Sequence, residues 1–268
     1  MGDRTVRRHP GMGGGAGTVK TADYLERRYM AEETASPKYR HEDKYLCDSM
    51  QNAVLKARAG AILKRDGHTA QDGFYRVRSL YFDSIHDSCY YENEDGIGER
   101  DKYRIRIYNA DPTHIFLEKK SKKRQMTLKQ SCRIDEPLCR RLMNGRPVGN
   151  ISGMDRELQS LLVQMQTRAM RPAVIVEYTR YPFVEANGNV RVTFDEDIES
   201  SADAAGFLEK RIACRPVLGT GMSVLEVKWD EFLPGYIKNF IQLDSLQWGS
   251  FSKYYLCRKY NAYGGIRI

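Results

Sequence analysis

The sequence has 268 residues, of which 41 % are hydrophobic and 29 % are charged, as in a globular protein with a high charge content. Lys and Arg outnumber Asp and Glu by 43 to 35, which gives a formal net charge of +8. No apolar run approaches the ~20 residues that a membrane span needs, so no membrane-spanning helix is expected.

The six cysteines are scattered through the chain and form no CxxC pair. The N-terminus also lacks the apolar segment of a signal peptide. Together these features favour free thiols in a reducing compartment, and we expect a cytoplasmic protein. A zinc site is not expected, because His41 and His114 each lie far from a second pair of ligands.

Residues 1–36 contain the run GMGGGAG and no durable periodicity, which predicts a flexible N-terminal tail. We expect residues 37–268 to form one domain dominated by strands. Its first strand is predicted in KYRHEDKYLC. The next segment, DSMQNAVLKARAGAILKRDG, predicts a helix with Asp48 or Ser49 as its N-cap and Gly67 at its end.

Most of the remaining elements are also predicted to be strands. FYRVRSLYFDS is followed by a loop and then by a predicted meander of RDKYRIRIYN, THIFLEKKSK and QMTLKQSCRID, with its first turn at residues 110–112. Residues 136–171 predict two helices. AVIVEYTRYPF and VRVTFDEDI predict a hairpin around residues 187–189, and SVLEVKWDE predicts the last strand. GYIKNFIQLDSLQ and FSKYYLCRKY predict two closing helices.

Ionic and apolar side chains alternate along nearly all of these strands. In RDKYRIRIYN, for example, Lys102, Arg104 and Arg106 alternate with tyrosine and isoleucines. One basic strand is explained by a sheet edge, but seven or eight strands cannot all be edges. About eight such strands can close into an antiparallel β-barrel, with the ionic faces inward and helices over the apolar outer faces. The alternative is an open sheet whose ionic face is exposed to solvent.

The residues that this pattern turns inward carry an excess of positive charge. The cations are Arg40, Lys44, Arg104, Arg106, Lys120, Lys129, Arg180, Arg191 and Lys228, and the acids are Glu42, Glu118, Asp195 and Glu226. Such an excess is costly unless an anion compensates it. Phosphate chains fit, because Arg binds their oxygens with two parallel hydrogen bonds and Lys adds charge. Nucleic acid is not expected, since inward-facing cations cannot reach a duplex.

The strands in this order resemble the triphosphate tunnel metalloenzymes, a CYTH-like superfamily, and within it most closely the VTC domain. The matching pieces cover about residues 38–260 and are YRHEDKY, VRSLYFDS, KYRIRIY, FLEKKSKK, VEYTRYPF, VRVTFDEDI, VLEVKWDEFLP and SFSKYY. The resemblance implies an α+β fold: an antiparallel, eight-stranded, closed β-barrel with a basic interior, covered by helices and plugged by a C-terminal helix.

The resemblance also implies site residues. The triphosphate or polyphosphate ligands that it implies are Lys44, Arg104, Arg106, Lys120, Lys129, Tyr178, Arg180, Arg191, Ser252 and Lys253, to which we add Lys228 from its inward position. The period-2 alternation (the parity of the residue number along a strand) turns Lys120, and not Lys119, toward the interior. Glu226 matches the metal ligand, expected to bind Mn²⁺ or Mg²⁺, and Glu42 and Glu118 are further candidates. Of the whole set, the residues expected to act in catalysis are Lys44, Arg104, Arg106, Glu226 and Lys253.

The function implied is that of an ATP-dependent polyphosphate polymerase. It transfers the γ-phosphate of ATP to phosphate, pyrophosphate or a growing polyphosphate chain. Hydrolytic members of the superfamily begin with ExExK, whereas this chain has Arg40-x-Glu42-x-Lys44, with one acid fewer. The alternatives are a tripolyphosphatase or nucleoside triphosphatase of the same fold, and a polyphosphate-binding module without turnover. The sequence identifies no protein partner.

Overall fold

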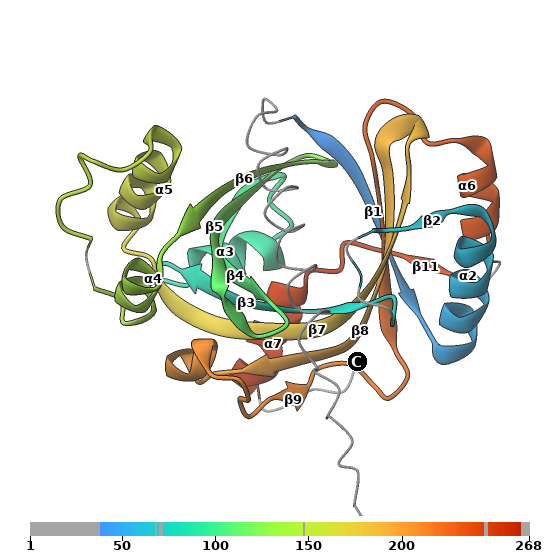
Figure 1. The fold of residues 1–268 in the computed structure, drawn as a ribbon. Helices are drawn as coiled ribbons and strands as arrows, with labels where there is room; N and C mark the ends of the chain where they lie inside the picture. Colours follow the sequence, from blue (N-terminus) through green and yellow to red (C-terminus); the bar gives the residue numbers. More distant parts are fainter. Residues whose placement is uncertain (1–37, 68, 70–71, 147, 244–245, 264–268) are drawn as a thin grey trace, which may run out of the picture.

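The structure is a computed structural model that describes residues 38–67, 69, 72–146, 148–243 and 246–263 (Figure 1). The predicted N-terminal tail lies outside the described residues. The long strands are β1 (Arg40–Cys47), β3 (Tyr75–Asp83), β4 (Glu99–Tyr108), β5 (Asp111–Lys123), β6 (Met126–Ile134), β7 (Arg171–Glu185), β8 (Val190–Ser201) and β10 (Ser223–Trp229). The short strands are β2 (Lys64–Arg65), β9 (Arg215–Pro216) and β11 (Gln247–Trp248). The helices are α2 (Ser49–Ile62), α3 (Ser88–Glu94), α4 (Glu136–Met143), α5 (Arg156–Thr167), α6 (Gly235–Ile241) and α7 (Lys253–Tyr263).

The eight long strands pair into a closed antiparallel ring. Its order is β7-β3-β4-β5-β6-β1-β10-β8, and β8 pairs again with β7. The shortest ladder in the ring is between β1 and β6, where only Arg40 and His41 of β1 pair with residues of β6. Further along β1, the two residues of β11 pair with Tyr45 and Leu46. The expected closed sheet is therefore confirmed, and the open sheet is excluded.

Helices cover the outer face of the ring on two opposite sides (Figure 1). On one side α2 and α6 bury Leu55 and Ile237 against Phe194 and Leu225 of β8 and β10. On the other side α4 and α5 pack on the outward-facing residues of β3, β4, β5 and β7, including Ile105. Because the apolar faces of the strands are buried under helices, their ionic faces point into the ring.

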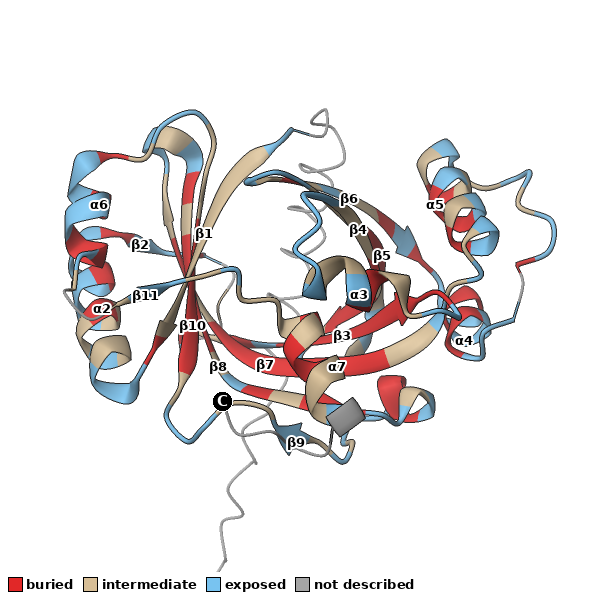
Figure 2. Ribbon diagram, turned by 180° about the vertical axis from the view of Figure 1, so that it is seen from behind, coloured by how far each residue is buried: buried red, intermediate tan, exposed pale blue. Residues whose placement is uncertain are grey.

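The C-terminal helix α7 closes one end of the ring, together with α3 (Figure 2). Tyr254 and Cys257 of α7 pack in one buried cluster with Val176 and Val224. Val176 has the parity of Arg180 on β7, and Val224 has the parity of Glu226 on β10, so both valines lie on the inner face. The predicted plug therefore fills this end of the ring with apolar side chains.

Several local predictions differ from the structure; for example, the helix predicted in GYIKNFIQLDSLQ ends at Ile241, and Gln247–Trp248 form strand β11 after the strand that was expected to be the last. The helix after β1 has Asp48 as its N-cap, as expected, but it ends at Ile62 because Leu63 is extended and Lys64–Arg65 pair with β7. The turn between β4 and β5 is formed by Asn109 and Ala110, both with positive φ, and residues 111–112 already belong to β5. Two positive φ values match the twist of a two-residue hairpin turn.

None of the six cysteines forms a disulfide, and five of them are buried. Within the described residues, no helix combines the length and the apolar character needed to cross a membrane.

Candidate functional site

The ring encloses a cavity of about 960 Å³ that every residue of the predicted site lines. Among the lining residues, Lys and Arg outnumber Asp and Glu by fifteen to eight. The strands supply all of the predicted residues except Ser252 and Lys253, which lie just before and at the first residue of α7. The parity of the strands thus brings side chains from seven strands and one helix into a single basic cavity.

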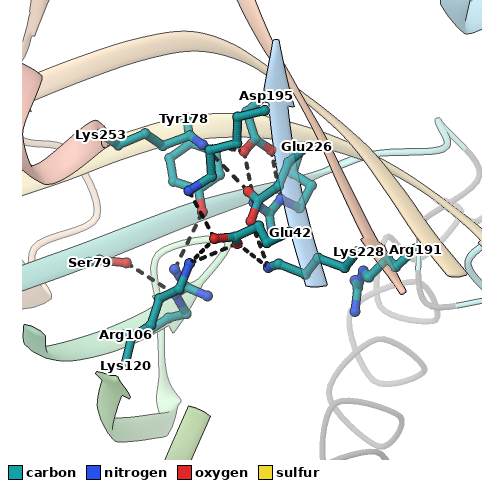
Figure 3. Close-up of polar contacts among 12 residues, drawn as sticks. Glu42, Ser79, Arg106, Lys120, Tyr178, Arg191, Asp195, Glu226, Lys228 and Lys253 are labelled. Carbon is teal, nitrogen blue, oxygen red and sulfur yellow. Dashed lines mark hydrogen bonds and ion pairs between the residues drawn. The ribbon is translucent and has the colours of Figure 1, made fainter. Parts of the chain in front are cut away.

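Glu42 and Glu226 lie next to each other and are surrounded by lysines (Figure 3). Glu42 accepts from Lys120 Nζ at 2.7 Å, and its Oε2 lies 3.1 Å from Lys44 Nζ. Glu226 Oε1 lies 2.7 Å from Lys228 Nζ. Burial opposes ionisation of both acids, but the surrounding lysines hold the pKa of each below its ordinary value. This pair is therefore anionic inside a buried cavity.

Burial acts differently on the lysines around this pair. It lowers the pKa of Lys120 to about 7, because Glu42 only partly offsets the loss of water and the charge of Lys44. It also lowers the pKa of Lys228. For Lys44, in contrast, Glu42 and Glu226 overcome the effect of burial and raise the pKa. The site therefore contains lysines that gain a proton readily when an anion approaches.

Glu118 lies on β5 and binds arginines. Its Oε2 accepts from Arg104 Nε at 2.7 Å, and it lies 3.7 Å from Arg106 Nη1. Arg106 also donates to Ser79 Oγ and to the Tyr178 hydroxyl, at 3.1 and 3.4 Å. Lys129 Nζ also lies 3.6 Å from Glu118. Glu118 therefore positions the guanidinium groups of Arg104 and Arg106, and the structure does not bring it together with Glu42 and Glu226.

Asp195 is a fully buried anchor behind the cavity. Its carboxylate accepts two hydrogen bonds from Arg180, at 2.7 and 2.8 Å. Lys253 Nζ lies 2.6 Å from the same carboxylate and 3.9 Å from Glu226. Asp195 thus fixes one arginine of β7 and the first residue of α7 in the same place. Figure 3 shows Asp195 with Lys253.

Two acids that the sequence pattern missed reduce the expected excess of charge. Arg191 Nη2 lies 2.9 Å from Asp66, in the chain just after β2, and Arg40 Nε lies 2.6 Å from Asp230, just after β10. The count of nine inward cations against four acids was therefore incomplete. Asp66 lies outside the alternating strands, so no periodicity marks it, whereas Asp230 follows Glu226 and Lys228 at the same spacing of two and was left out of the count.

Two tyrosines of β3 belong to the site although they were not predicted, and the two neighbouring lysines of β5 lie on opposite faces of the sheet. Arg104 Nη1 donates to the Tyr81 hydroxyl at 2.8 Å, and Arg191 Nη2 donates to the Tyr75 hydroxyl at 2.9 Å. Their shared parity on β3 was a signal that could have found both tyrosines. Lys120 lines the cavity as parity favours, whereas Lys119 pairs outside it with Asp101 at 3.0 Å.

His41 lies outside the cavity, and the acids inside it supply few ligands for a metal ion. The His41 ring stacks on Trp229 at 5.2 Å between centroids, and His41 does not line the cavity. Within the described residues, no group of three His, Cys, Asp or Glu side chains is placed to hold a metal ion. Glu42 and Glu226 supply two neighbouring carboxylates. Mn²⁺ and Mg²⁺ fit such a pair when substrate phosphates and water complete their coordination.

A closed antiparallel ring with a basic, carboxylate-containing interior defines the triphosphate tunnel class of proteins. A family model described as the VTC domain matches residues 39–261, and the chain belongs to this family. No curated protein matches the sequence.

Solved structures with the tunnel fold resemble this chain at low sequence identity. A Hippeastrum protein, named as an adenylyl cyclase candidate and reported to have a dominant triphosphatase activity, is 12 % identical, with a TM-score of 0.51 over 85 % of this chain and 97 % of that chain. An adenylate cyclase candidate from Bacillus halodurans is 13 % identical, with a TM-score of 0.43 over 72 % and 82 %. The mimivirus capping enzyme triphosphatase is 12 % identical, with a TM-score of 0.38 over 83 % and 98 %. At such identity, the likeness to the first of these shows the fold alone.

Proposed function

We propose that this chain is a metal-dependent polyphosphate polymerase, with residues 37–268 as its catalytic domain. It transfers the γ-phosphoryl group of ATP to phosphate, pyrophosphate or polyphosphate and releases ADP. The observation that carries the proposal is the enclosed cavity, in which arginines from opposite walls converge on a space lined by Glu42 and Glu226. The membership of the VTC domain family supports it.

The arginines have the chemistry and the positions to hold a triphosphate. Arg104 and Arg106 come from β4, Arg180 from β7 and Arg191 from β8, so they surround the cavity. Carboxylates and tyrosine hydroxyls hold these guanidinium groups before a ligand arrives. Preorganised cations of this kind stabilise the negative charge that spreads over the transferred phosphoryl group.

The acceptor is itself an anion, so the reaction needs positioning more than a strong base. A terminal phosphate oxygen of the acceptor attacks the γ-phosphorus in line, and the bond from this phosphorus to the bridging oxygen of ADP breaks. Lys253 and Ser252, at the start of α7, are placed to hold the acceptor phosphate. Glu42 and Glu226 would hold Mn²⁺ or Mg²⁺, which neutralises charge on the phosphate oxygens when bound.

The second candidate is hydrolysis of tripolyphosphate or nucleoside triphosphate, with water as the acceptor. The triphosphatase activity reported for the Hippeastrum protein of the same fold favours it. Against it, Arg40 replaces the first acid of the hydrolytic motif and binds Asp230, which leaves two neighbouring carboxylates for a metal. The third candidate is a polyphosphate-binding module without turnover.

One experiment separates these candidates. The purified protein is incubated with ATP and Mn²⁺ or Mg²⁺, and the phosphate species are separated on a gel. A ladder of condensed phosphates supports the polymerase. Release of orthophosphate without a ladder supports the hydrolase, and the absence of both supports a binding module.

A further inference from the structure

Two pairs of like-charged residues face each other across β4 and β5. Arg100 pairs with Lys122, and Lys102 pairs with Lys120. All four side chains line the cavity. Like charges directly opposite each other destabilise a sheet, so this arrangement needs a reason.

Three of these cations lack an acidic partner at ion-pair distance. Arg100 Nη1 donates to the Ile97 carbonyl at 2.7 Å, and Lys102 Nζ donates to Asn93 Oδ1 and Ser252 Oγ at 2.8 and 2.7 Å. In the part of the chain that the structure describes, neither residue forms an ion pair, and neither does Lys122. The cations of the proposed triphosphate site, in contrast, each lie within 4 Å of a carboxylate.

The pKa values of the two lysines agree with this geometry. Burial lowers the pKa of Lys102 well below its ordinary value, and the charges of Arg100, Lys44 and Lys120 lower it further. Burial and the charge of Arg100 also lower the pKa of Lys122. An anion placed between these side chains would reverse the effect, because it favours the protonated form of each lysine.

Two of the three residues, Arg100 and Lys102, continue the row of the triphosphate site along β4, and Lys122 lies opposite Arg100 on β5. Arg100, Lys102, Arg104 and Arg106 share the inner face of β4, and six residues of strand span about 20 Å. Through Ser252, Lys102 also touches the segment that precedes α7. The row therefore runs from the arginines that bind Glu118 to the end of the ring where α7 and α3 lie, and it is longer than three linked phosphates.

We propose that Arg100, Lys102 and Lys122 form an outer phosphate lane, a second binding site for a linear condensed phosphate. The lane takes the part of the acceptor or product chain that extends beyond the triphosphate site. This role in chain growth rests on the proposed function, but the binding itself does not. A linear chain carries charge on every unit and can contact both cross-strand pairs, about 7 Å apart, whereas orthophosphate can contact only one.

Binding measurements on the metal-free protein test this lane without turnover. Calorimetry compares tripolyphosphate with a long-chain polyphosphate for the wild type and for the triple variant Arg100→Gln, Lys102→Gln and Lys122→Gln. The matched control is Lys123→Gln, because Lys123 follows Lys122 but does not line the cavity, and its side chain is 60 % exposed. Circular dichroism and the melting temperature of each variant establish that it is folded.

We expect the triple variant to bind long-chain polyphosphate at least about tenfold more weakly, because it loses charge-assisted hydrogen bonds. Its affinity for tripolyphosphate should change less than threefold, and Lys123→Gln should behave like the wild type. An unchanged affinity for long polyphosphate, or an equal loss for both ligands, would overturn the proposal. So would wild-type binding of a single-stranded oligonucleotide that competes with polyphosphate and is lost in the triple variant.

The outcome is separable from that of the proposed function. A protein that makes no ladder from ATP, but loses long-chain affinity in the triple variant, contradicts the polymerase and supports the lane. A protein that makes a ladder while the variant binds long chains normally supports the polymerase and overturns the lane.

Discussion

Glu42 and Glu226 lie diagonally opposite each other across two adjacent strands, with lysines at the other two corners. In the ladder between β1 and β10, Glu42 pairs with Lys228 and Lys44 pairs with Glu226. This checkerboard keeps two buried carboxylates ionised without a metal, because each has an opposite charge directly across the ladder. It also places both oxygen donors on the same wall of the cavity.

The first prediction concerns the metal. Glu226→Gln removes one carboxylate and leaves a side chain of the same shape, so the fold should persist. Lys228 loses its nearest partner, and Mn²⁺ binding should weaken together with turnover, the latter by about a hundredfold or more. Mn²⁺ binding is measured by electron paramagnetic resonance in the presence of tripolyphosphate, and turnover by release of ADP from ATP.

The control for the metal prediction is Glu231→Gln, since Glu231 is an exposed glutamate whose one ion pair among the described residues is with Lys38. It should bind Mn²⁺ and turn over ATP like the wild type. Wild-type turnover of Glu226→Gln at limiting Mn²⁺ would rule Glu226 out as the metal ligand.

The second prediction concerns the arginines of β4. A ligand at a hundredfold excess over its Kd adds about 2.7 kcal/mol to the stability, which is roughly 5–10 °C in Tm for a domain of this size. Tripolyphosphate should produce this shift, and orthophosphate at equal ionic strength should produce much less. Arg104→Ala or Arg106→Ala should reduce the tripolyphosphate shift by more than half in a thermal melt.

The structure also predicts how these arginine variants behave without a ligand. Repulsion between Arg104 and Arg106 alone would make their removal stabilising. However, Glu118 is buried and its pKa is well below the ordinary value because both arginines overcome the effect of burial. Arg104→Ala leaves this carboxylate under-compensated, so the ligand-free Tm should fall. If tripolyphosphate and orthophosphate raise the Tm equally, and the arginine variants respond like the wild type, Arg104 and Arg106 do not form a triphosphate site.

The third prediction concerns the plug. The Tyr254 hydroxyl donates to Asp83, whose carboxylate also accepts from the backbone N–H groups of Cys89 and Tyr90 at the start of α3. Tyr254→Phe removes the link from α7 to this carboxylate and should cost about 1–3 kcal/mol, or roughly 2–10 °C in Tm. The matched control is Tyr255→Phe, because the Tyr255 hydroxyl accepts a hydrogen bond from Lys259 and, among the described residues, donates none to an acid. Equal melting of both variants would show that the link to Asp83 does not stabilise the plug.

The side of the sheet on which each strand residue lies could be predicted from the sequence. The outer face of the ring is apolar and covered by helices, whereas the inner face is ionic and lines the cavity. A strand with helices outside and an ionic cavity inside must alternate strictly, and a shift of one residue would exchange the two faces. Lys120 and Lys119 illustrate this, since one lines the cavity and the other pairs with Asp101 outside it. Lys102 shares the parity of Arg104, so the alternation also pointed to it, although the predicted site omitted it.

The rest of the site depends on tertiary contacts without a local pattern. Asp66 reaches Arg191 only because the chain after α2 pairs for two residues with β7. Asp230 reaches Arg40 because the ladder between β1 and β10 brings the ends of both strands together. Asp66 belongs to no alternating run. Asp230 continues the alternation of Glu226 and Lys228 by one step, so only its contact with Arg40, and not its inward position, depends on the tertiary pairing.

The last prediction concerns the pH dependence of anion binding. Burial lowers the pKa of Lys120 from 10.5 to about 7, so in the free protein this amine is neutral above that pH. A bound polyanion favours the ammonium form. Below about pH 7 the proton is already present, whereas above it binding must take one up, which weakens the affinity by up to about tenfold per pH unit. The lowered pKa also affects stability. Between about pH 7 and pH 10.5 Lys120 is neutral in the folded protein and protonated in the unfolded chain, so the ligand-free protein becomes more stable as the pH rises through this range.

Calorimetry of tripolyphosphate binding between about pH 6 and about pH 9, with a chelator present to exclude metal, measures this effect. The binding enthalpy in buffers of different ionisation enthalpy gives the number of protons taken up on binding. We expect this number to be positive above pH 7 and to be smaller in Lys120→Arg. The guanidinium stays charged throughout this range. Because tripolyphosphate itself titrates equally with both proteins, the difference between wild type and Lys120→Arg isolates the lysine. Parallel pH profiles for the two proteins would show that Lys120 is already charged in the free cavity, and that Glu42 outweighs the effect of burial.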